Sequence, residues 1–280
     1  MGVQVGRGES GEVRFSFGKN WSSFLEWVTE ERIQTAVESL SAMLGESTLS
    51  QRRFLDAGSG SGLFSLAARR MGAAVHSFDY DQDSVAATAE LKRRFYPGDC
   101  AWHVEQASVL DDVYMDSLGD FDVVYSWGVL HHTGQMWKAI DNVTRRVCPG
   151  GRLFISIYNH MGGASRRWTW IKRTYCGLPT FLRLPFAIMV TTPIQAYSIF
   201  VHLVQGKLSA YVDNIRNYRK HRGMSWWHDQ LDWIGGYPYE DAKPEEIFDF
   251  VKQRGFSLER LKTWGGASGC NEFLFVKTTS

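Results

Sequence analysis

Residues 54–62 read FLDAGSGSG, with three glycines at two-residue spacing directly after a short apolar run. Glycine has no Cβ, so Gly58, Gly60 and Gly62 let the backbone turn sharply from a strand into a helix and come close to a ligand. The pattern is typical of the loop after a strand of an α/β sheet. It therefore predicts a strand, a tight loop and a helix that together form a ligand site.

The spacing of the glycines distinguishes between two classes of cofactor. A dinucleotide loop has the pattern GxGxxG, and it would need a glycine at position 63, where this chain has Leu63. The loop instead begins with Asp56, and a carboxylate suits a ligand with ammonium and sulfonium charges better than one with phosphates. We expect S-adenosylmethionine (SAM), and an NAD-dependent oxidoreductase is the less favoured alternative.

A second acidic residue follows the loop. The apolar segment Ala74–Asp79 ends in Asp79, about twenty residues past the loop, where a carboxylate can bind the hydroxyl groups of a ribose. Asp79 could instead cap the next helix, but Asp81, Asp83 or Ser84 can do so without it. We predict that Asp79 binds the ribose.

Further apolar runs alternate with helical patterns. They lie at residues 102–106, 121–126 and 152–158, and the last follows a turn made by Cys-Pro-Gly-Gly at 148–151. Strands that alternate with helices predict a doubly wound parallel sheet of the α/β class.

At this point the motifs resemble those of the class I SAM-dependent methyltransferases. The similar stretch covers residues 53–158 and includes DAGSGSG, the acid that ends the second strand, SVLD after the third, FDVVYSWGVLHHT at the fourth and PGG before the fifth. The resemblance implies a Rossmann-like sheet of seven mostly parallel strands, in which residues 256–263 and 271–277 supply a final antiparallel pair.

The resemblance also implies a cofactor site at the carboxyl ends of the strands. Its residues would be Asp56, Gly58, Ser59, Gly60 and Gly62 around the methionine part, Asp79 at the ribose with Tyr80 beside the adenine, Ser108 and Val109 at the adenine edge, and Ser126 and Trp127 on the path to the methyl group.

The chain divides into four predicted segments: an N-terminal helical cap at 1–50, a SAM-binding core at 51–159, a helical lid or substrate insertion at 160–240, and a C-terminal helix with the antiparallel strand pair at 241–280. Ligands of open α/β sheets bind outside the carboxyl ends of the strands, so an insertion after the fifth strand covers that crevice.

The formal net charge of +1 conceals a basic insertion. Residues 160–223 hold ten Lys or Arg residues against one acid, Asp213. Such a balance favours a small-molecule acceptor that is anionic or lipid-linked. Nucleic acid is less favoured, because the chain has no recognisable RNA-binding appendage.

Residues 186–204 of this insertion contain no Lys, Arg, Asp or Glu. A membrane span needs about twenty apolar residues, and the centre of this segment is too polar for one. The polar or helix-breaking residues there are Thr191, Thr192, Pro193, Gln195 and Tyr197. We expect lid helices, with peripheral contact to an anionic membrane as the alternative.

Two adjacent histidines, His131 and His132, follow the fourth strand. A sulfonium methyl group is already activated, so catalysis mainly aligns the acceptor and excludes water. A hydroxyl acceptor must also lose a proton, and histidine is the usual base. His132 is the preferred candidate and His131 the second, while the alternative is that both only bind backbone groups.

Candidate acceptor-binding residues come from three segments that are expected to meet at the carboxyl ends of the strands. They are Tyr158, Asn159 and His160 after the fifth strand, Trp233 and Tyr237 around a Gly-Gly turn, and Trp21 in an aromatic N-terminal segment expected to fold over the cofactor. Each could equally serve only in packing.

The four cysteines are far apart and form no CxxC pair, which indicates neither a metal site nor a disulfide framework and fits a cytoplasmic location. The N-terminus has no pattern of a signal peptide. We expect a SAM-dependent methyltransferase that acts by in-line transfer on a hydroxyl oxygen of a sugar, quinone, lipid-linked or natural-product acceptor. A noncatalytic adaptor or membrane-surface partner subunit is the alternative, although the intact loop favours cofactor binding.

Overall fold

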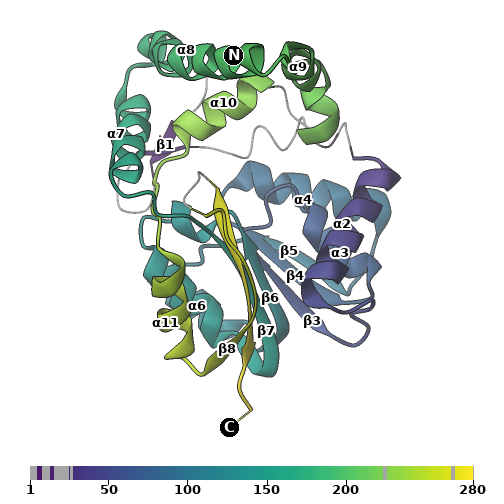
Figure 1. Ribbon diagram of the computed structural model, residues 1–280. Coiled ribbons are helices and arrows are strands. Elements are labelled where there is room, and N and C mark those ends of the chain that lie inside the picture. The colour runs from purple at the N-terminus through teal and green to yellow at the C-terminus, as the bar shows by residue number, and fades with distance from the viewer. Residues whose placement is uncertain are drawn as a thin grey trace.

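The computed structural model describes residues 5–7, 13–15, 25, 28–222, 226–265 and 269–279. Its main sheet has seven strands in the order β5-β4-β3-β6-β7-β9-β8. These are β3 (Arg53–Ala57), β4 (Ala74–Asp79), β5 (Trp102–Gln106), β6 (Phe121–Trp127), β7 (Val147–Tyr158), β8 (Phe256–Lys262) and β9 (Cys270–Lys277). Strands β3 to β7 pair in parallel, and β9 runs antiparallel to β7 and β8. The predicted α/β fold, with its antiparallel pair at the C-terminus, is confirmed (Figure 1).

Helices cover both faces of the sheet (Figure 1). One face packs against α2 (Glu30–Leu44), α3 (Leu63–Arg70) and α4 (Gln82–Phe95). The other packs against α5 (Asp112–Ser117), α6 (Met136–Arg145) and α11 (Pro244–Lys252). Two hydrophobic clusters, one on each face, therefore hold the sheet between two helical layers.

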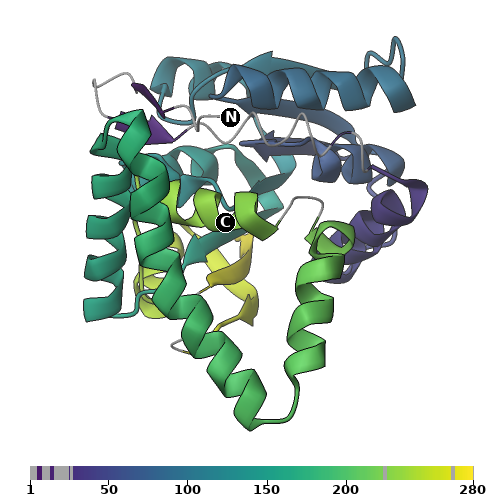
Figure 2. The same ribbon diagram turned by 90° about the horizontal axis from the view of Figure 1, so that it is seen from above.

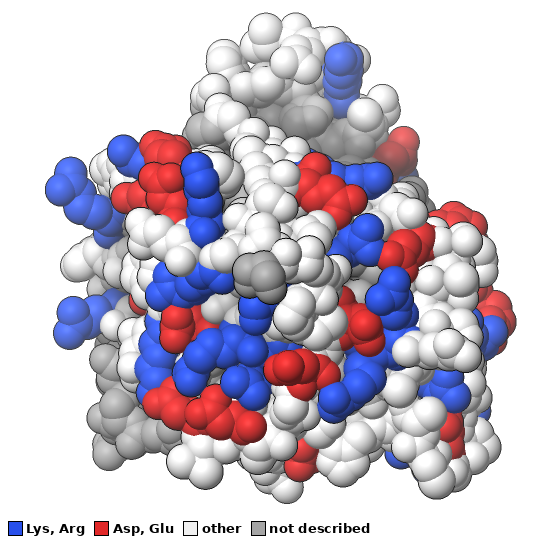
Figure 3. Space-filling view, turned by 90° about the horizontal axis from the view of Figure 1, so that it is seen from below, with Lys and Arg blue, Asp and Glu red and all other residues white. Residues whose placement is uncertain are grey.

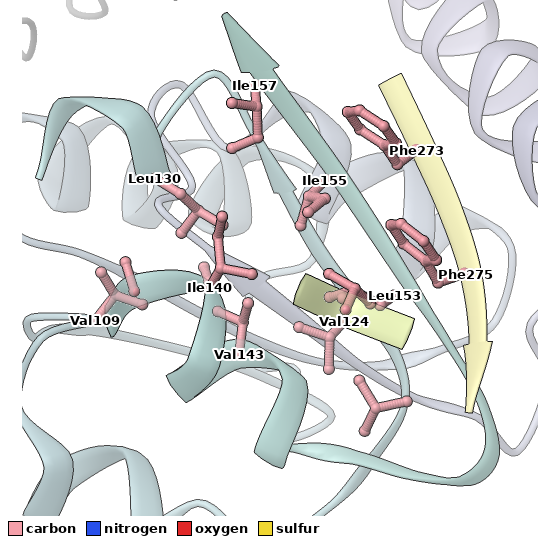
Figure 4. Packing of buried hydrophobic residues seen from close by; sticks show 14 of the residues in the cluster. Val109, Val124, Leu130, Ile140, Val143, Leu153, Ile155, Ile157, Phe273 and Phe275 are labelled. Carbon is pink, nitrogen blue, oxygen red and sulfur yellow. The ribbon is translucent and has the colours of Figure 1, made fainter. Parts of the chain in front are cut away.

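Strand β7 shows how the sequence produces these two layers. Leu153, Ile155 and Ile157 belong to the cluster on the α6 side, whereas Phe154 belongs to the cluster on the α2 side, as the two-residue period of a strand requires. Figure 4 shows the three aliphatic side chains packed among the aromatic residues of β9 and the aliphatic residues of α6. Full burial of each such side chain contributes about 1.5–3 kcal/mol.

The insertion between β7 and α11 consists of four helices: α7 (Gly163–Gly177), α8 (Thr180–Val204), α9 (Leu208–Arg222) and α10 (Trp226–Gly235). They lie over the carboxyl ends of the parallel strands (Figure 1), and α8 and α9 form a hairpin that projects beyond the core (Figure 2). A third cluster, with Tyr175 of α7, Ala187 of α8 and Ile234 of α10, holds three of these helices together.

The N-terminal region contains a feature that the sequence did not predict. Strands β1 (Val5–Arg7) and β2 (Val13–Phe15) form a separate antiparallel pair. This region was expected to be helical, and only α2 and a short turn at Leu25 are helical among its described residues.

Charged side chains of both signs are intermingled on the underside of the core, as Figure 3 shows. Arg146 pairs with Asp116 at 3.1 Å, and Arg152 pairs with Glu259 at 3.2 Å. These cations of the core have acidic neighbours. The insertion, in contrast, holds ten Lys or Arg residues against one acid, so the excess of positive charge belongs to it.

Candidate functional site

The glycine loop leaves β3 at its carboxyl end and leads into α3. Gly58 and Gly62 have φ angles of 86° and 78°, in the left-handed region that favours glycine. A Cβ on Gly58 would lie 2.4 Å from Cγ1 of Val129, and one on Gly62 would lie 2.8 Å from Cα of Thr88. Both the backbone conformation and the close packing therefore exclude a larger residue at these two positions.

Asp79 ends β4 and holds this loop in place. One carboxylate oxygen accepts the backbone N–H of Gly60 at 2.9 Å, and the other accepts that of Asp81 at 2.9 Å. The cap of α4 is Asp81, which accepts the N–H of Asp83. Because Asp81 caps the helix and each carboxylate oxygen can accept more than one hydrogen bond, the geometry leaves Asp79 suited to a diol.

A cavity of about 40 Å³ lies at the carboxyl ends of β3, β4 and β5. Five of the predicted cofactor residues line it: Gly58, Asp79, Tyr80, Ser108 and Val109. The sequence did not predict the other five, which are Phe78, Ala107, Leu110, Val129 and Thr133. A cavity of this size holds only a few water molecules, so a nucleoside can enter only when the lining opens.

Asp56 lies beneath the loop and does not line this cavity. Its carboxylate accepts the hydroxyl of Ser65 in α3, and Ser65 is joined through Ser77 to the indole N–H of Trp102. Burial raises the pKa of Asp56 from 3.8 to about 7, although the hydrogen bond from Ser65 opposes that rise. The structure thus makes Asp56 an anchor between β3 and α3, and its contact with the methionine part of SAM stays a prediction.

Three more predicted cofactor residues surround the same loop. Ser59 is buried, with its hydroxyl 2.9 Å from that of Thr88. Ser126 is also buried and donates its hydroxyl to the carbonyl of Ala57, so it joins β6 to the start of the loop. Trp127, in contrast, is 47% exposed and donates its indole N–H to Glu272 at 3.3 Å.

Trp127 also lines a second cavity, of about 720 Å³, which the sequence did not predict. This cavity lies between α2 and the strands β6 to β9, and its walls combine apolar and charged side chains. The residues that line it include Phe64, Tyr125, Phe154, Lys262 and Glu272. No pattern local in the sequence could reveal it, because these residues come from five different elements.

The two histidines of the turn Leu130–His132 have different surroundings. His131 is fully buried with its ring 4.0 Å from that of Tyr158, and neither of its nitrogens has a hydrogen-bond partner of ordinary geometry among the described residues. Burial holds its pKa well below the usual value, and the neighbouring His132 and Lys172 lower it further. His131 is therefore neutral and enclosed, which does not suit a base that must reach an acceptor.

His132 is better placed for proton transfer. Its Nδ1 lies 2.6 Å from the carbonyl oxygen of Pro238. A carbonyl only accepts hydrogen bonds, so Nδ1 carries the proton and Nε2 is the basic nitrogen of the neutral ring. The side chain is 7% exposed.

The predicted acceptor-binding residues pack between the core and the lid. The ring of Tyr158 lies 5.1 Å from that of Tyr239, Asn159 accepts the side-chain amide of Asn271, and Nδ1 of His160 lies 3.0 Å from Asp241.

Trp233 and Tyr237 belong to the hydrophobic cluster of the lid, where the ring of Trp233 lies 3.6 Å from that of Trp168. Trp21 lies outside the described residues. These contacts agree with the packing alternative, and acceptor binding by any of the six stays a prediction.

A buried lysine in this region was missed. Lys172 of α7 is 1% exposed, donates to the carbonyl of Trp233, and lies 5.1 Å from the centres of the rings of Trp233 and Tyr239. Burial lowers its pKa from 10.5 to about 7. The sequence placed it among the surface cations of the insertion, and only its position one turn after Trp168 on the apolar side of α7 could have indicated burial.

Three possible metal ligands lie together away from this site. His76, His103 and Glu105 place their ligand atoms within 4.8 Å of one another on β4 and β5. His76 bonds Glu105 at 2.8 Å, and Tyr114 donates to the same carboxylate. These hydrogen bonds account for the arrangement without an ion.

Comparison with known proteins agrees with this geometry. Residues 55–153 match the family model of the methyltransferase domain. An uncharacterized protein from Synechococcus sp. is 31% identical over 121 residues, which are 42% of this chain and 28% of that protein, so the chain spans less than a third of that relative.

Two of the solved structures that share the fold have a ligand bound. Magnesium protoporphyrin IX methyltransferase from Synechocystis PCC 6803, with S-adenosylhomocysteine (SAH) bound, is 14% identical and has a TM-score of 0.52, with 88% of this chain and 83% of that one covered. The N-terminal domain of EvdMO1, with SAH bound, is 13% identical and has a TM-score of 0.51, with 91% and 84% covered.

The fold, the glycine loop and the matched segment define a Rossmann-like methyltransferase domain. Residues 55–153 match the methyltransferase domain, which agrees with the resemblance to class I SAM-dependent methyltransferases seen in the sequence. SAM is the cofactor of that class.

Proposed function

We propose that this protein transfers a methyl group from SAM to a hydroxyl oxygen of a small-molecule acceptor by in-line displacement. The observation that carries the proposal is the cavity at the ends of β3, β4 and β5, where the glycine loop faces Asp79 and Tyr80. Among the described residues, this site combines a close backbone approach with a carboxylate positioned for a ribose. A cytoplasmic location is part of the same proposal.

The chemistry required of the protein is limited. SAM supplies an activated methyl group, so the chain must align the acceptor oxygen, exclude water and remove one proton. We assign the proton removal to Nε2 of His132, because the hydrogen bond of Nδ1 to Pro238 orients the ring and leaves Nε2 as the basic nitrogen of the neutral tautomer.

The cavity of about 720 Å³ beside Trp127 provides room for the acceptor. Phe64 and Phe154 give it apolar walls, while Lys262 and Glu272 supply polar groups at its rim. Apolar walls with a few polar groups suit a ring-containing or amphipathic molecule. We therefore propose a quinone, a sugar, a natural product or a lipid-linked acceptor.

The neighbours in fold support small molecules as acceptors. One is named as a methyltransferase of magnesium protoporphyrin IX, and the other was also crystallised in the presence of SAH and D-fucose. Their identity to this chain is too low to choose between a porphyrin-like ring and a sugar, so the acceptor class rests on the cavity.

Titration calorimetry with SAM, SAH and NADH tests the proposed cofactor site. Asp79→Ala removes the carboxylate that faces the ribose, and it should weaken SAH binding by about 1–3 kcal/mol, roughly fivefold to a hundredfold. Asp249→Ala, an exposed carboxylate on α11, is the matched control and should bind SAH as the wild type does. Binding of NADH but not SAH would contradict the proposal, as would an unchanged affinity in Asp79→Ala.

Methyl-labelled SAM, incubated with quinols, sugars and lipid-linked alcohols, tests the transfer step. Label in one of these acceptors supports the proposal. Tight binding of SAM with no transfer to any of them would favour the noncatalytic alternative.

A further inference from the structure

Helix α8 exposes its apolar side chains to the outside of the molecule. Of its 25 residues only Ala187 and Thr191 are buried. Eleven of its large apolar residues are between 40% and 76% exposed, and those most exposed are Phe181, Met189, Tyr197, Phe200, Leu203 and Val204. These residues recur at helical spacing, so they form one continuous stripe along the outer side.

The inner side of the same helix is apolar around Ala187, which belongs to the third cluster, and polar in the C-terminal half. Gln195 accepts the hydroxyl of Tyr211 in α9 at 2.9 Å and donates to Gln230 in α10 at 3.3 Å. His202 contacts the carbonyl of Ser198, and its ring lies 5.2 Å from that of Tyr211. The C-terminal half of the helix thus has the opposite polarity to an ordinary surface helix, and a stripe of this size on the outside indicates an apolar partner.

The charges around α8 identify that partner. The helix has no Lys, Arg, Asp or Glu from Leu184 to its end. Lys207 follows this stretch and is exposed, while Arg183 precedes it and donates to the carbonyls of Leu178 and Cys176. The tip of the hairpin that projects at the top of Figure 3 is accordingly almost free of charged side chains. Exposed cations also lie on the adjoining helices, among them Arg166 and Arg173 of α7 and Arg216 of α9.

We propose that α8 binds the surface of an anionic lipid bilayer, with the helix in the plane of the membrane and its apolar stripe among the acyl chains. Cations that flank an apolar helical face are complementary to anionic head groups. A second copy of this chain, docked through the same face about a two-fold axis, would instead bring these cations opposite one another.

The contacts of α8 favour this orientation over a span. The helix is long and apolar enough to cross a membrane by length and composition, and 11% of its most apolar window is buried. A crossing helix would have to leave α9 and α10 and lose the hydrogen bonds of Gln195 to Tyr211 and Gln230. In-plane binding keeps these bonds and brings the lid, which covers the acceptor side of the sheet, to the membrane (Figure 1).

Vesicle flotation with the purified protein tests the inference. The vesicles contain phosphatidylcholine with or without phosphatidylglycerol, at low and high salt. The wild type should float with the anionic vesicles, and less so at high salt. Met189→Glu/Phe200→Glu places two charges in the stripe and should weaken binding by about tenfold or more.

The matched control introduces the same two charges at exposed apolar residues elsewhere. Val113→Glu/Trp137→Glu lies on α5 and α6, where the side chains are 82% and 37% exposed, and it should bind vesicles as the wild type does. Unchanged circular dichroism and SAH affinity in both double variants show that the fold and the cofactor site remain intact, so the result does not depend on the proposed methyl transfer.

Four outcomes would overturn the inference. The wild type could fail to bind anionic vesicles at low salt, or the two double variants could bind equally well. Retention on vesicles after an alkaline carbonate wash would show a helix that crosses the bilayer. Self-association that Met189→Glu/Phe200→Glu abolishes, without vesicle binding, would assign the stripe to a second copy of the chain.

Discussion

Replacement of Asp56 by asparagine should change how the stability of the protein depends on pH. The buried carboxyl has a folded pKa of about 7, above its ordinary 3.8. The group is therefore protonated at low pH in the fold, and the stabilisation it contributes is complete below about pH 4 and is lost as the pH rises through 7. At about 1.4 kcal/mol for each pKa unit, the loss amounts to about 4 kcal/mol. Asparagine keeps an oxygen that can accept the hydroxyl of Ser65 and has no proton to lose.

Urea denaturation of the wild type and Asp56→Asn between pH 5 and pH 7 measures this effect. The free energy of unfolding of the variant, relative to the wild type, should rise by about 1.4 kcal/mol for each pH unit and level off above pH 7. Asp249→Asn, at an exposed position, should give a curve parallel to that of the wild type. Parallel curves for Asp56→Asn as well would refute the reasoning, because they would show that Asp56 titrates alike in the folded and unfolded states.

Three further substitutions have defined outcomes. Gly58→Ala places a Cβ against Val129, so it should lower the free energy of unfolding by about 1–3 kcal/mol and weaken SAH binding. Gly163→Ala, at a position with open space around it, should change neither quantity. Thermal unfolding measures the stability and calorimetry the SAH affinity. His132→Asn keeps a donor for the carbonyl of Pro238 but has no base, so turnover should fall by about two to four orders of magnitude with SAH affinity unchanged, and a small loss would indicate a structural role. Burial lowers the pKa of Lys172 to about 7. The free energy of unfolding of the wild type, relative to that of Lys172→Met, should therefore rise by about 1.4 kcal/mol for each pH unit between pH 7 and about 10. Free energies of unfolding that differ by a constant amount over this range, measured by urea denaturation, would contradict the prediction.

The parts of the fold that the sequence predicted correctly are those with local patterns. The glycine loop is determined by the φ angles and the close packing of Gly58 and Gly62, and both require glycine itself. The buried parallel strands read as continuous apolar runs because both of their faces are covered. Asp79 ends β4 next to the loop that it holds, as the pattern indicated, and its contact with the ribose stays a prediction.

Features that depend on distant neighbours could not be predicted in the same way. Asp56 reads as a loop residue, yet the direction of its side chain follows from the pairing of β3 with β4, which brings Ser77 and Trp102 beneath it. His131 and His132 are adjacent in the sequence, and only the packing of Tyr158 and the position of Pro238 distinguish an enclosed ring from an oriented one. The cavity beside Trp127 requires knowledge of how six elements meet.

Helix α8 was difficult to predict for a different reason. Its polar stripe is visible in the sequence, but the stripe faces the protein, whereas such a stripe usually faces water. Thr191, Gln195, Ser198 and His202 recur one turn apart, and such a polar stripe ordinarily marks the side that faces water. In the fold this stripe faces inward, where Gln195 and His202 contact α9 and α10 or the helix backbone. Buried polar groups need hydrogen bonds, and these partners supply them. The apolar side must then face outward, so the polarity of the helix is consistent with its surroundings only if those surroundings include a surface less polar than water.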